Sequence, residues 1–353
     1  MAASTKEQLY QQLLGLSYEE KVYKTYYELR DDPPAREAYL AEVADYALEN
    51  GLLIPELAGA QIPEVFSEET YYSFLPIGRG SNVNVCRHSR YTPVFRYSTS
   101  FFEILYVLDG HIGHTLADED FPLSKGDVSF IPPGVKRTIE VFDESVVLSI
   151  HIRHDTFADA FFSVLRYDNI LSDFFMSSLY SQRPARNILF PTGEDLEIRD
   201  MILEMYQEAH QGDAYSWRLL NNLVPMFFAK LLRGYSDQAV LRGPSKSRTS
   251  RVSTLSMLSF INDHYRTVSL QEFAEQFHYS IPHCSRLIRE ETGMGFSAFV
   301  RRVKMNHVLP LLRGTNLSVA EISSQVGYEN PESFIRAFEK LYSMSPTAYR
   351  RRP

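Results

Sequence analysis

The chain has 353 residues, with 36 Lys and Arg against 44 Asp and Glu and a formal net charge of −8; this length predicts roughly two or three domains. Its two cysteines, Cys86 and Cys284, exclude a disulfide framework and a cysteine-rich metal site. The N-terminal sequence has no apolar signal-peptide core, and no apolar run approaches the roughly 18 residues of a transmembrane helix. We therefore expect a cytoplasmic protein without membrane contact.

Residues 1–66 are predicted to form a helical extension. Leucines from Leu9 to Leu16 mark a first helix, and a second apolar stripe runs from Tyr39 to Leu48. The sequence Asp32-Pro33-Pro34 separates them, and Asn50-Gly51 ends the second. The pattern indicates an element for packing or for pairing, and does not distinguish the two.

Residues 67–154 are predicted to form a strand-rich domain. Short β-branched and aromatic runs alternate with turns such as Asp109-Gly110 and Pro132-Pro133-Gly134. This spacing is typical of an antiparallel sandwich or barrel. The predicted strands are Phe101–Leu108, His111–Leu116, Phe121–Leu123, Val128–Ile131, Arg137–Phe142 and Val146–Ile152.

Residues 155–241 return to helical spacing and are predicted to form a helical region. Apolar stripes run from Phe157 to Leu179, from Leu196 to Tyr206 and from Leu219 to Leu231. Such stripes are typical of a core. Their excess of Phe also favours pairing of two chains across one of these helices, so we expect a homodimer contact here.

Residues 242–250 are small, polar and basic, which predicts a linker. The charge changes sign across it. From Ser245 to Pro353 the chain has 15 Lys and Arg against 9 Asp and Glu, whereas the remainder has 21 against 35. A basic domain beside an acidic body is typical of a DNA-binding protein with a separate sensing or pairing module.

Two helix-turn-helix units are predicted within residues 251–353. In the first, Ser269 and Glu272 form a capping box before an apolar helix. After a short break, a second helix turns Cys284, Leu287 and Ile288 inward and presents a polar and basic outer face. This arrangement fits a major groove.

The same pattern returns about fifty residues later. Ser318 and Glu321 repeat the capping box, and Pro331 opens the following helix, where its missing N–H is harmless. A linking helix over Phe296–Arg313, about 27 Å long at 1.5 Å per residue, joins the units. It allows two recognition helices to enter successive major grooves about 34 Å apart. The second recognition helix is expected to bury Phe334, Ala337, Phe338 and Leu341.

The stretch from Ser253 to Arg350 resembles the DNA-binding domain of AraC/XylS-type bacterial transcription regulators. The resemblance rests on the order and spacing of SLQEFAEQF, SRLIREETG, LRGTNLSVAEISSQVGY and SFIRAFEKLYSMSPTAYR. It implies a regulator that binds double-stranded DNA, with RNA polymerase as a further partner if the protein is an activator. Pro310 departs from the pattern because it removes the helix bond to the Asn306 carbonyl, so we expect a kink in the linking helix.

Arg286 and Arg336 lie on the two recognition helices and are the predicted readers of guanine, since a guanidinium matches its O6 and N7 atoms. The alternative for each arginine is a phosphate contact or a solvated charge. The other predicted DNA contacts are base edges for Pro282, Ser285, Glu332 and Ser333, and phosphates for Arg289 and Lys340.

The stretch from Pro93 to Ile152 resembles the cupin-type sensing domain that often precedes this DNA-binding domain. Metal-binding cupins carry a histidine pair shortly before a glutamate and a further histidine after a Pro-Gly turn. Here Glu103 matches the glutamate, whereas Tyr97, Thr99 and Arg137 stand at the histidine positions. An arginine cannot ligate a transition metal. We therefore expect no metal and no cofactor, and a cupin enzyme fused to a DNA-binding domain is the less favoured alternative.

A small barrel can enclose one small ligand. The Arg137 fork suits a carboxylate or phosphate, and Tyr97 and Glu103 can read hydroxyl groups. These residues predict a pocket for a small polar effector, sugar-like or carboxylate. The alternative is that Arg137 and Glu103 pair inside a filled barrel, and that the regulator responds to a protein partner or to its own abundance. The sequence thus predicts an α+β transcription regulator and leaves the effector open.

Overall fold

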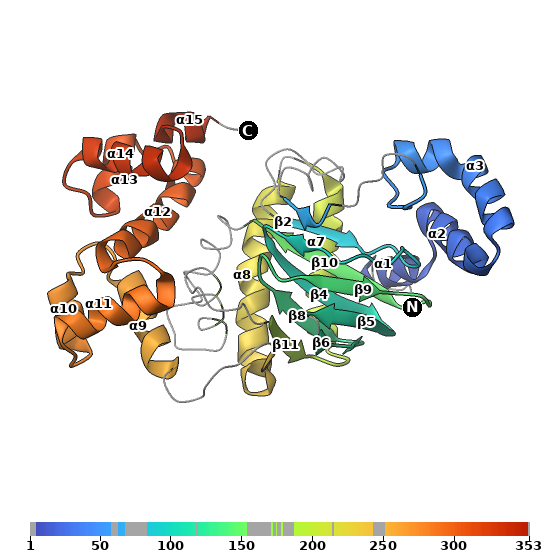
Figure 1. Cartoon of the computed structure of the whole chain (residues 1–353), viewed down its shortest axis with the longest axis horizontal. Helices are drawn as coiled ribbons and strands as arrows, with labels where there is room; N and C mark the ends of the chain where they lie inside the picture. Colours follow the sequence, from blue (N-terminus) through green and yellow to red (C-terminus); the bar gives the residue numbers. More distant parts are fainter. Residues whose placement is uncertain are drawn as a thin grey trace. The chain divides into compact units, whose positions relative to one another are not determined.

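The structure is a computed structural model that describes residues 5–57, 63–67, 83–117, 119–153, 171, 174, 178, 187–213, 215–242 and 251–351. These residues form two compact units. The first takes the described part of Met1–Arg153 and Ala185–Gly243, and the second takes that of His154–Pro184 and Pro244–Pro353. Within these ranges the strands belong to the first unit and the second is helical (Figure 1). The predicted α+β class is confirmed.

The first unit is built on two antiparallel sheets. The strands are β1 Val65–Phe66, β2 Val83–Arg87, β3 Ser98–Thr99, β4 Phe102–Asp109, β5 His111–Leu116, β6 Glu119–Asp120, β7 Leu123–Ser124, β8 Asp127–Ile131, β9 Arg137–Glu140, β10 Val146–Ile152, β11 Asn187–Pro191 and β12 Val240–Arg242. The larger sheet has the order β12-β11-β8-β4-β10-β2, and the smaller has β6-β5-β7 with β9 also paired to β5. β1 and β3 form a separate parallel pair. The strands predicted from residue 101 to residue 152 are confirmed to within a few residues at their ends.

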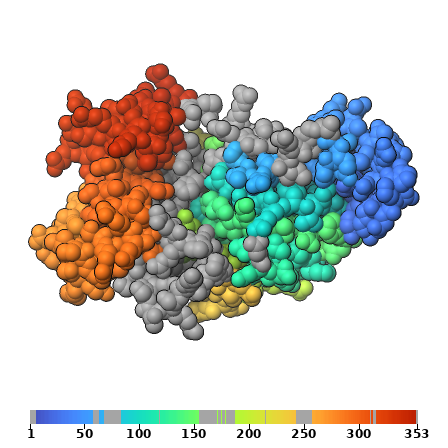
Figure 2. Space-filling view, in the orientation of Figure 1, coloured from blue at the N-terminus to red at the C-terminus, as the bar shows by residue number. Residues whose placement is uncertain are grey.

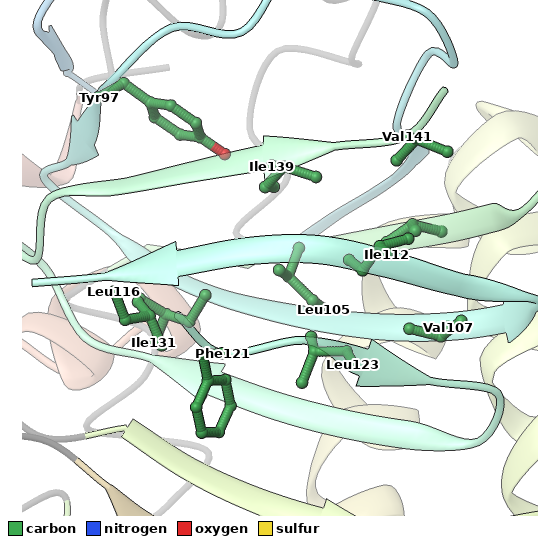
Figure 3. Packing of buried hydrophobic residues seen from close by; sticks show 11 residues of the cluster. Tyr97, Leu105, Val107, Ile112, Leu116, Phe121, Leu123, Ile131, Ile139 and Val141 are labelled. Atoms are coloured by element: carbon green, nitrogen blue, oxygen red, sulfur yellow. The ribbon is translucent and has the colours of Figure 1, made fainter. Parts of the chain in front are cut away.

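The core of the barrel lies between the two sheets. Side chains alternate across a strand, so Leu105 and Val107 of β4 share the inner face with Val147 of β10. Figure 3 shows these inner side chains meeting Ile112 of β5 and Ile139 of β9. The middle of the barrel is therefore packed with apolar side chains.

Two helices cover the outer face of the larger sheet. α7 (Leu196–Gln211) contacts β2, and α8 (Ser216–Tyr235) contacts β2 and β11 (Figure 1). Phe228 of α8 packs on Phe130 of β8 with ring centroids 5.3 Å apart, and Phe130 meets Phe190 of β11 at 5.6 Å. The Phe-rich stripe of α8 thus packs on the barrel. Leu219, which the periodicity places in that stripe, is instead 46% exposed because the buried face runs through Leu220 and Val224.

The prediction of a helical region over residues 155–241 is wrong at two places. β11 pairs with β8, and β12 pairs with β11, so both complete the larger sheet. The run Asn187–Pro191 is too short for a helix, and its Ile, Leu and Phe side chains fit a pleated sheet. Arg242, expected to begin the linker, is the last residue of β12. Most of the stripe from 157 to 179 and residues 243–250 lie outside the described residues.

The N-terminal extension packs against the barrel. Its helices are α1 Thr5–Leu14, α2 Tyr18–Glu28 and α3 Pro33–Glu49, with short 3₁₀ helices at Leu29–Asp31 and, later in the unit, at Ser236–Gln238. A cluster of buried apolar side chains from α2 and α3 includes Tyr91 of the barrel. Tyr27 of α2 stacks on Phe142 at 4.5 Å between ring centroids. The surfaces of the extension and the barrel lie directly against each other (Figure 2).

A buried ion pair fixes this contact. Arg90 donates from Nε to Glu20 Oε1 at 3.0 Å and from Nη2 to Glu20 Oε2 at 2.9 Å, and both side chains are fully buried. Arg90 also donates to the carbonyl oxygens of Leu14 at 3.1 Å and Gly15 at 2.7 Å. Arg87 reaches the same carboxylate from β2 at 3.0 Å. These bonds tie the end of α1 and the start of α2 to the barrel.

The second unit consists of seven helices in its described range. They are α9 Arg251–Asp263, α10 Leu270–Gln276, α11 Ile281–Thr292, α12 Phe296–Gly314, α13 Val319–Gln325, α14 Pro331–Tyr342 and α15 Pro346–Arg350. The predicted capping boxes at Ser269 and Ser318 are both confirmed. Among the helices that the structure describes in either unit, none has the length and apolar character that crossing a bilayer requires.

Gly327 is predicted to be irreplaceable in the turn between α13 and α14. Its φ of +78° favours glycine, and a Cβ there would lie 2.5 Å from the Arg266 carbonyl oxygen. Gly327→Ala should destabilise the second unit by at least about 1–2 kcal/mol, the cost of the left-handed backbone alone. Thermal unfolding followed by circular dichroism measures this. Gly234→Ala is the control because a Cβ at that helical position meets open space; equal melting temperatures for the two variants would contradict the prediction.

Candidate nucleic-acid interface and ligand pocket

The two helix-turn-helix units present equivalent recognition helices. Ser280 caps α11 and Asn330 caps α14, each accepting a backbone N–H of the first turn. Cys284 and Ile288 are the inward side chains of α11. The inward side chains of α14 are Phe334 and Phe338, fifty positions further on. The same helix face is therefore buried in both units, and the same opposite face is left outward.

The outward faces carry the predicted DNA contacts. Arg286 and Arg336 each occupy the sixth position of their helix and are exposed. Arg286 lies 3.1 Å from His283 Nδ1 and 3.8 Å from Glu290, contacts on its own helix that leave its side chain 65% exposed. The remaining predicted contacts are exposed at Pro282, Arg289, Glu332, Ser333 and Lys340 and half-buried at Ser285. The individual roles of these residues stay predictions.

One inward residue of α14 was predicted wrongly. Leu341 is 48% exposed. The buried stripe passes from Phe338 to Tyr342, whose rings lie 4.6 Å apart, and continues to Tyr349 of α15. Because Tyr342 takes the inward position one turn after Phe338, Leu341 falls to the side of the core.

α12 connects the two helix-turn-helix units and fixes the turn between α13 and α14. It has 19 residues and is about 28 Å long at 1.5 Å per residue. Lys304 donates from Nζ to the carbonyl oxygens of Gly327 at 2.7 Å and Arg266 at 3.1 Å. Its side chain thus holds the turn in front of α14. The helical backbone continues through Pro310, and the kink expected there stays a prediction.

A pocket of about 230 Å³ opens between the barrel and the extension. The extension contributes Glu19 and Tyr23 of α2 and the turn Asn50–Leu53. The barrel contributes a polar group of side chains and four aromatic rings. The polar group includes Cys86, His88, Thr99, Glu103, Ser149 and His151, and the rings are those of Phe66, Phe95, Tyr97 and Phe101.

Strand register brings the polar group together. Glu103 of β4 lies opposite His151 of β10, and Cys86 of β2 lies opposite Ser149 of the same strand. His151 Nε2 is 3.1 Å from Glu103 Oε1, and His151 Nδ1 is 4.0 Å from Cys86 Sγ. Three strands that are distant in sequence therefore place a carboxylate, an imidazole and a thiol in one row.

Arg137 is the second partner of Glu103. Its Nη2 forms an ion pair with Glu103 Oε2 and donates to Thr99 Oγ1 at 3.1 Å. Nη1 donates to the Val135 carbonyl at 3.0 Å, and the guanidinium lies 4.6 Å from the centroid of the Tyr97 ring. Arg137 is fully buried and is not part of the pocket wall. Tyr97 and Glu103 do line the pocket, so the structure brings all three predicted residues together. Arg137 and Glu103 form the ion pair that was the alternative to an effector-binding role for these residues.

Several pocket residues escaped prediction. The sequence pattern assigned no role to His151, Cys86 or His88. The alternation in Val83–Arg87 could have placed Cys86 on one face of a strand. The contribution of Asn50–Leu53 had no local signal, since it depends on how the extension docks.

Comparison with known proteins agrees with both halves of this architecture. A helix-turn-helix domain family matches residues 273–352, and an AraC-like ligand binding domain family matches residues 82–214. The chain belongs to the AraC family of transcription regulators. It is a DNA-binding transcription regulator with a ligand-binding domain, and neither matching family is enzymatic.

Relatives of this AraC-family chain differ in how much of it they share. The uncharacterized HTH-type transcriptional regulator YfiF of Bacillus subtilis (strain 168) is 24% identical over 256 residues, 71% of this chain and 77% of the relative. The HTH-type transcriptional activator RhaR of Mannheimia succiniciproducens is 22% identical over 294 residues, 78% of this chain and 94% of the relative. The multiple antibiotic resistance protein MarA of Escherichia coli (strain K12) is 26% identical over 107 residues, 30% of this chain and 84% of the relative.

The polar group does not suit a transition metal. The Glu103 carboxylate is held by Arg137 and His151, and the guanidinium stands where metal-binding cupins have a histidine. In the described ranges, no three Asp, Glu, His or Cys side chains are arranged to hold an ion. The group instead forms a buried ionic network within the ligand-binding domain.

Glu103 and His151 are both charged at neutral pH. Burial raises the carboxyl pKa, but Arg137 and His151 outweigh it and hold the pKa of Glu103 at about 2. Burial lowers the imidazole pKa, but Cys86 and Glu103 outweigh it and raise the pKa of His151 to about 9. The row therefore contains a carboxylate and an imidazolium.

The first unit should lose stability as the pH rises from about 6.5 to about 9. The pKa of His151 is about 9 in the folded chain and about 6.5 when unfolded. A raised pKa contributes stability that is complete below the unfolded value and is lost through the folded one. Glu103, with its lowered pKa, loses its contribution only as the pH falls from about 4.3 to about 2.

Denaturant unfolding across this pH range measures the effect. The single tryptophan, Trp217, lies in α8, so its fluorescence reports on the first unit. His151→Gln should flatten the alkaline decline, whereas His111→Gln, whose side chain is 79% exposed, should keep it. Equal slopes for His151→Gln and the wild type would contradict the ion pair.

Proposed function

We propose that this AraC-family regulator reads its operator with Arg286 and Arg336, in two successive major grooves of one DNA duplex. The proposal rests on the equivalent positions of the two arginines. Each is the sixth residue of its recognition helix, and each side chain is exposed. A guanidinium at such a position can donate two hydrogen bonds to guanine. A protein that recognised its operator through one residue would not need a repeated helix-turn-helix unit. Two base-contacting arginines select both the operator sequence and the distance between the two contacted base pairs.

The neighbouring side chains divide by their position along each helix. Pro282 and Ser285 on α11, and Glu332 and Ser333 on α14, lie in the first turns and are proposed to touch base edges. Arg289 and Lys340 lie further along and are proposed to hold phosphates. The net charge of +6 from Ser245 to Pro353 favours this contact with a polyanion.

A homodimer is proposed through α8. One face of α8 leaves Leu219 46% and Met226 54% exposed, and at the start of the helix Tyr215 is 66% and Trp217 41% exposed. Exposed aromatic groups of this kind favour a self-complementary contact. Such a cytoplasmic dimer would hold four helix-turn-helix units, and it would contact RNA polymerase if it acts as an activator.

The effector is proposed to bind in the pocket between the barrel and the extension. The middle of the barrel is filled, so the space lies at the polar end of the strands. Ser149, Thr99 and Glu103 offer groups that hydrogen-bond hydroxyls, which supports a small polar effector, sugar-like or carboxylate. The tight Arg137 and Glu103 pair and the filled core support the second candidate, a regulator controlled by a partner protein or by its abundance.

Operator selection and ligand screening test these proposals together. The full chain is used to select its operator from random duplex DNA, and the length of the protected site distinguishes one groove from two. Trp217 fluorescence then follows thermal unfolding with sugars, sugar acids and amino acids, because a ligand bound only to the folded state stabilises it. A shift by one compound, together with a change in operator affinity, supports the effector. A blank across the panel favours the partner-controlled regulator.

A further inference from the structure

The pocket wall contains a nucleophile with a histidine beside it. Cys86 Sγ lies 4.0 Å from His151 Nδ1, and His151 Nε2 lies 3.1 Å from Glu103 Oε1. All three residues line the 230 Å³ pocket, and Cys86 is half-buried whereas Glu103 and His151 are buried. The imidazole is thus oriented by a carboxylate on one nitrogen and faces a thiol with the other. This is the arrangement that activates a cysteine in nucleophilic catalysis.

A second group points to a ligand with an acceptor oxygen. His88 lies two residues beyond Cys86 and lines the same pocket. Its Nε2 is buried and makes no hydrogen bond within the described part of the chain. Burial lowers the pKa of His88, so the ring is neutral at pH 7. In its Nε2–H form it can donate to a carbonyl oxygen held in the pocket.

The phenols near the thiol add no charge, whereas the ionisable Glu19 and Arg87 also line the pocket, and Arg87 is paired with Glu20 at 3.0 Å. Tyr97 of the barrel and Tyr206 of α7 interact electrostatically with Cys86, and burial raises the pKa of both phenols. Both remain neutral at pH 7. Glu103 is compensated by Arg137, and the imidazolium of His151 places a positive charge beside the Cys86 sulfur.

The chain provides no second thiol for a disulfide with Cys86. The other of its two cysteines, Cys284, is fully buried within α11 of the second unit. Oxidation of Cys86 would therefore give a sulfenic acid that no thiol of the chain resolves, open to irreversible further oxidation. Addition to an electrophile needs no such partner. The flat rings of Phe66, Phe95 and Phe101 suit a planar, unsaturated molecule.

We propose that the pocket captures small α,β-unsaturated carbonyl compounds by addition to Cys86, with the His151 imidazolium as the proton donor and His88 as the donor to the carbonyl oxygen. The Cys86 thiol releases its proton to solvent, and its sulfur bonds to the β-carbon beside the positive charge of His151. The π electrons move toward the carbonyl, the enolate then takes a proton from the His151 imidazolium at its α-carbon, and His151 regains a proton from solvent. The thiol has added across the double bond, with no oxidant, reductant or leaving group. This inference rests on the proposed function in so far as the pocket is the effector site.

The reaction of the full chain with methyl vinyl ketone tests the proposal. Intact mass and peptide mapping should show one adduct, at Cys86, formed at least about ten times faster in the folded chain than in urea. Cys284→Ser is the matched control and should react like the wild type, whereas Cys86→Ser should form no adduct in the pocket. Reaction of Cys86 no faster in the folded chain than in urea would overturn the proposal.

The role of His151 is tested separately. His151→Gln should slow the addition about tenfold at pH 7, and its rate should depend more steeply on pH between about 6 and 8 than that of the wild type. An unchanged rate and pH profile would remove His151 from the mechanism. Faster modification of Cys86 by hydrogen peroxide than by the ketone would overturn carbonyl capture in favour of oxidant sensing. The effector proposal fails in a different measurement, namely if no compound alters the affinity for the operator. That result would not affect the measurement of the Cys86 adduct.

Discussion

Arg286→Ala is expected to remove about 1–3 kcal/mol of discrimination at one base pair of the operator, while affinity for unrelated DNA changes much less. The reason is that a bidentate guanidinium bond to guanine exists only with the correct base. Alanine keeps the exposed helix intact, since it has a high helix propensity and Arg286 makes only exposed contacts with His283 and Glu290. The loss should therefore appear in binding and not in folding.

Arg336→Ala should produce the matching loss at a second base pair. The two arginines stand at equal positions in α11 and α14, joined by α12, so their two base pairs should lie about one turn of DNA apart, roughly 10 base pairs. Because the contacts are separated, the losses should add in the double variant. A kink at Pro310 that tilts α14 away would appear as a discrimination loss for Arg286→Ala alone.

Competition binding with single-base operator variants, at fixed salt, separates base reading from charge. Arg289→Ala is the control. It also removes one positive charge from α11, and as a phosphate contact it should weaken binding to all sequences alike and reduce the salt dependence. If Arg286→Ala instead behaved like Arg289→Ala, Arg286 would be a phosphate contact.

Glu20→Ala is expected to destabilise the first unit by about 3–5 kcal/mol, the cost of leaving a buried charge without its partner. Arg90 donates twice to this carboxylate, and both side chains are fully buried. Arg87 loses the same partner at 3.0 Å. Without Glu20, the guanidinium of Arg90 retains backbone carbonyl oxygens and a 3.5 Å ion pair with Glu144, whose side chain is 64% exposed, so it has no buried carboxylate partner.

Trp217 fluorescence during urea unfolding measures this loss. Asp31→Asn is the control, because it breaks an ion pair with Arg30 whose aspartate is 87% exposed, and it should cause no resolvable change. Glu20→Leu/Arg90→Leu removes both charges and should recover much of the stability. A midpoint for Glu20→Ala equal to that of the wild type would show that the extension does not depend on this pair.

The same substitution bears on the ligand pocket. Glu19 and Tyr23 lie on α2 beside Glu20 and form part of the pocket wall. Loss of the docked extension should therefore open the pocket as well as weaken the fold. The extension, whose role between packing and pairing the sequence left open, packs on its own barrel in this structure.

Local patterns predicted most of the elements correctly because they act over a few residues. The capping boxes of Ser269 with Glu272 and of Ser318 with Glu321 span one helical turn and form as predicted. The alternation in His111–Leu116 and Val146–Ile152 gave both strands their observed limits. Burial was predicted wrongly at Leu341 and Leu219, which lie at the edge of the apolar face of their helices. At such positions the packing of neighbouring elements decides which side of the helix is buried.

The repeated helix-turn-helix pattern, the charge reversal and the cupin-like strands are properties of the sequence by itself, and they determined an α+β DNA-binding regulator without a histidine-rich metal site. The tertiary structure alone decided what Glu103 contacts and what the extension does. Glu103 and His151 are 48 residues apart, and Glu20 and Arg90 are 70 apart. Their pairing follows from the order β4-β10-β2 and from the docking of α2. Strand register and packing across the core determine which buried charges pair, and the spacing of the residues along the chain does not reveal these pairs.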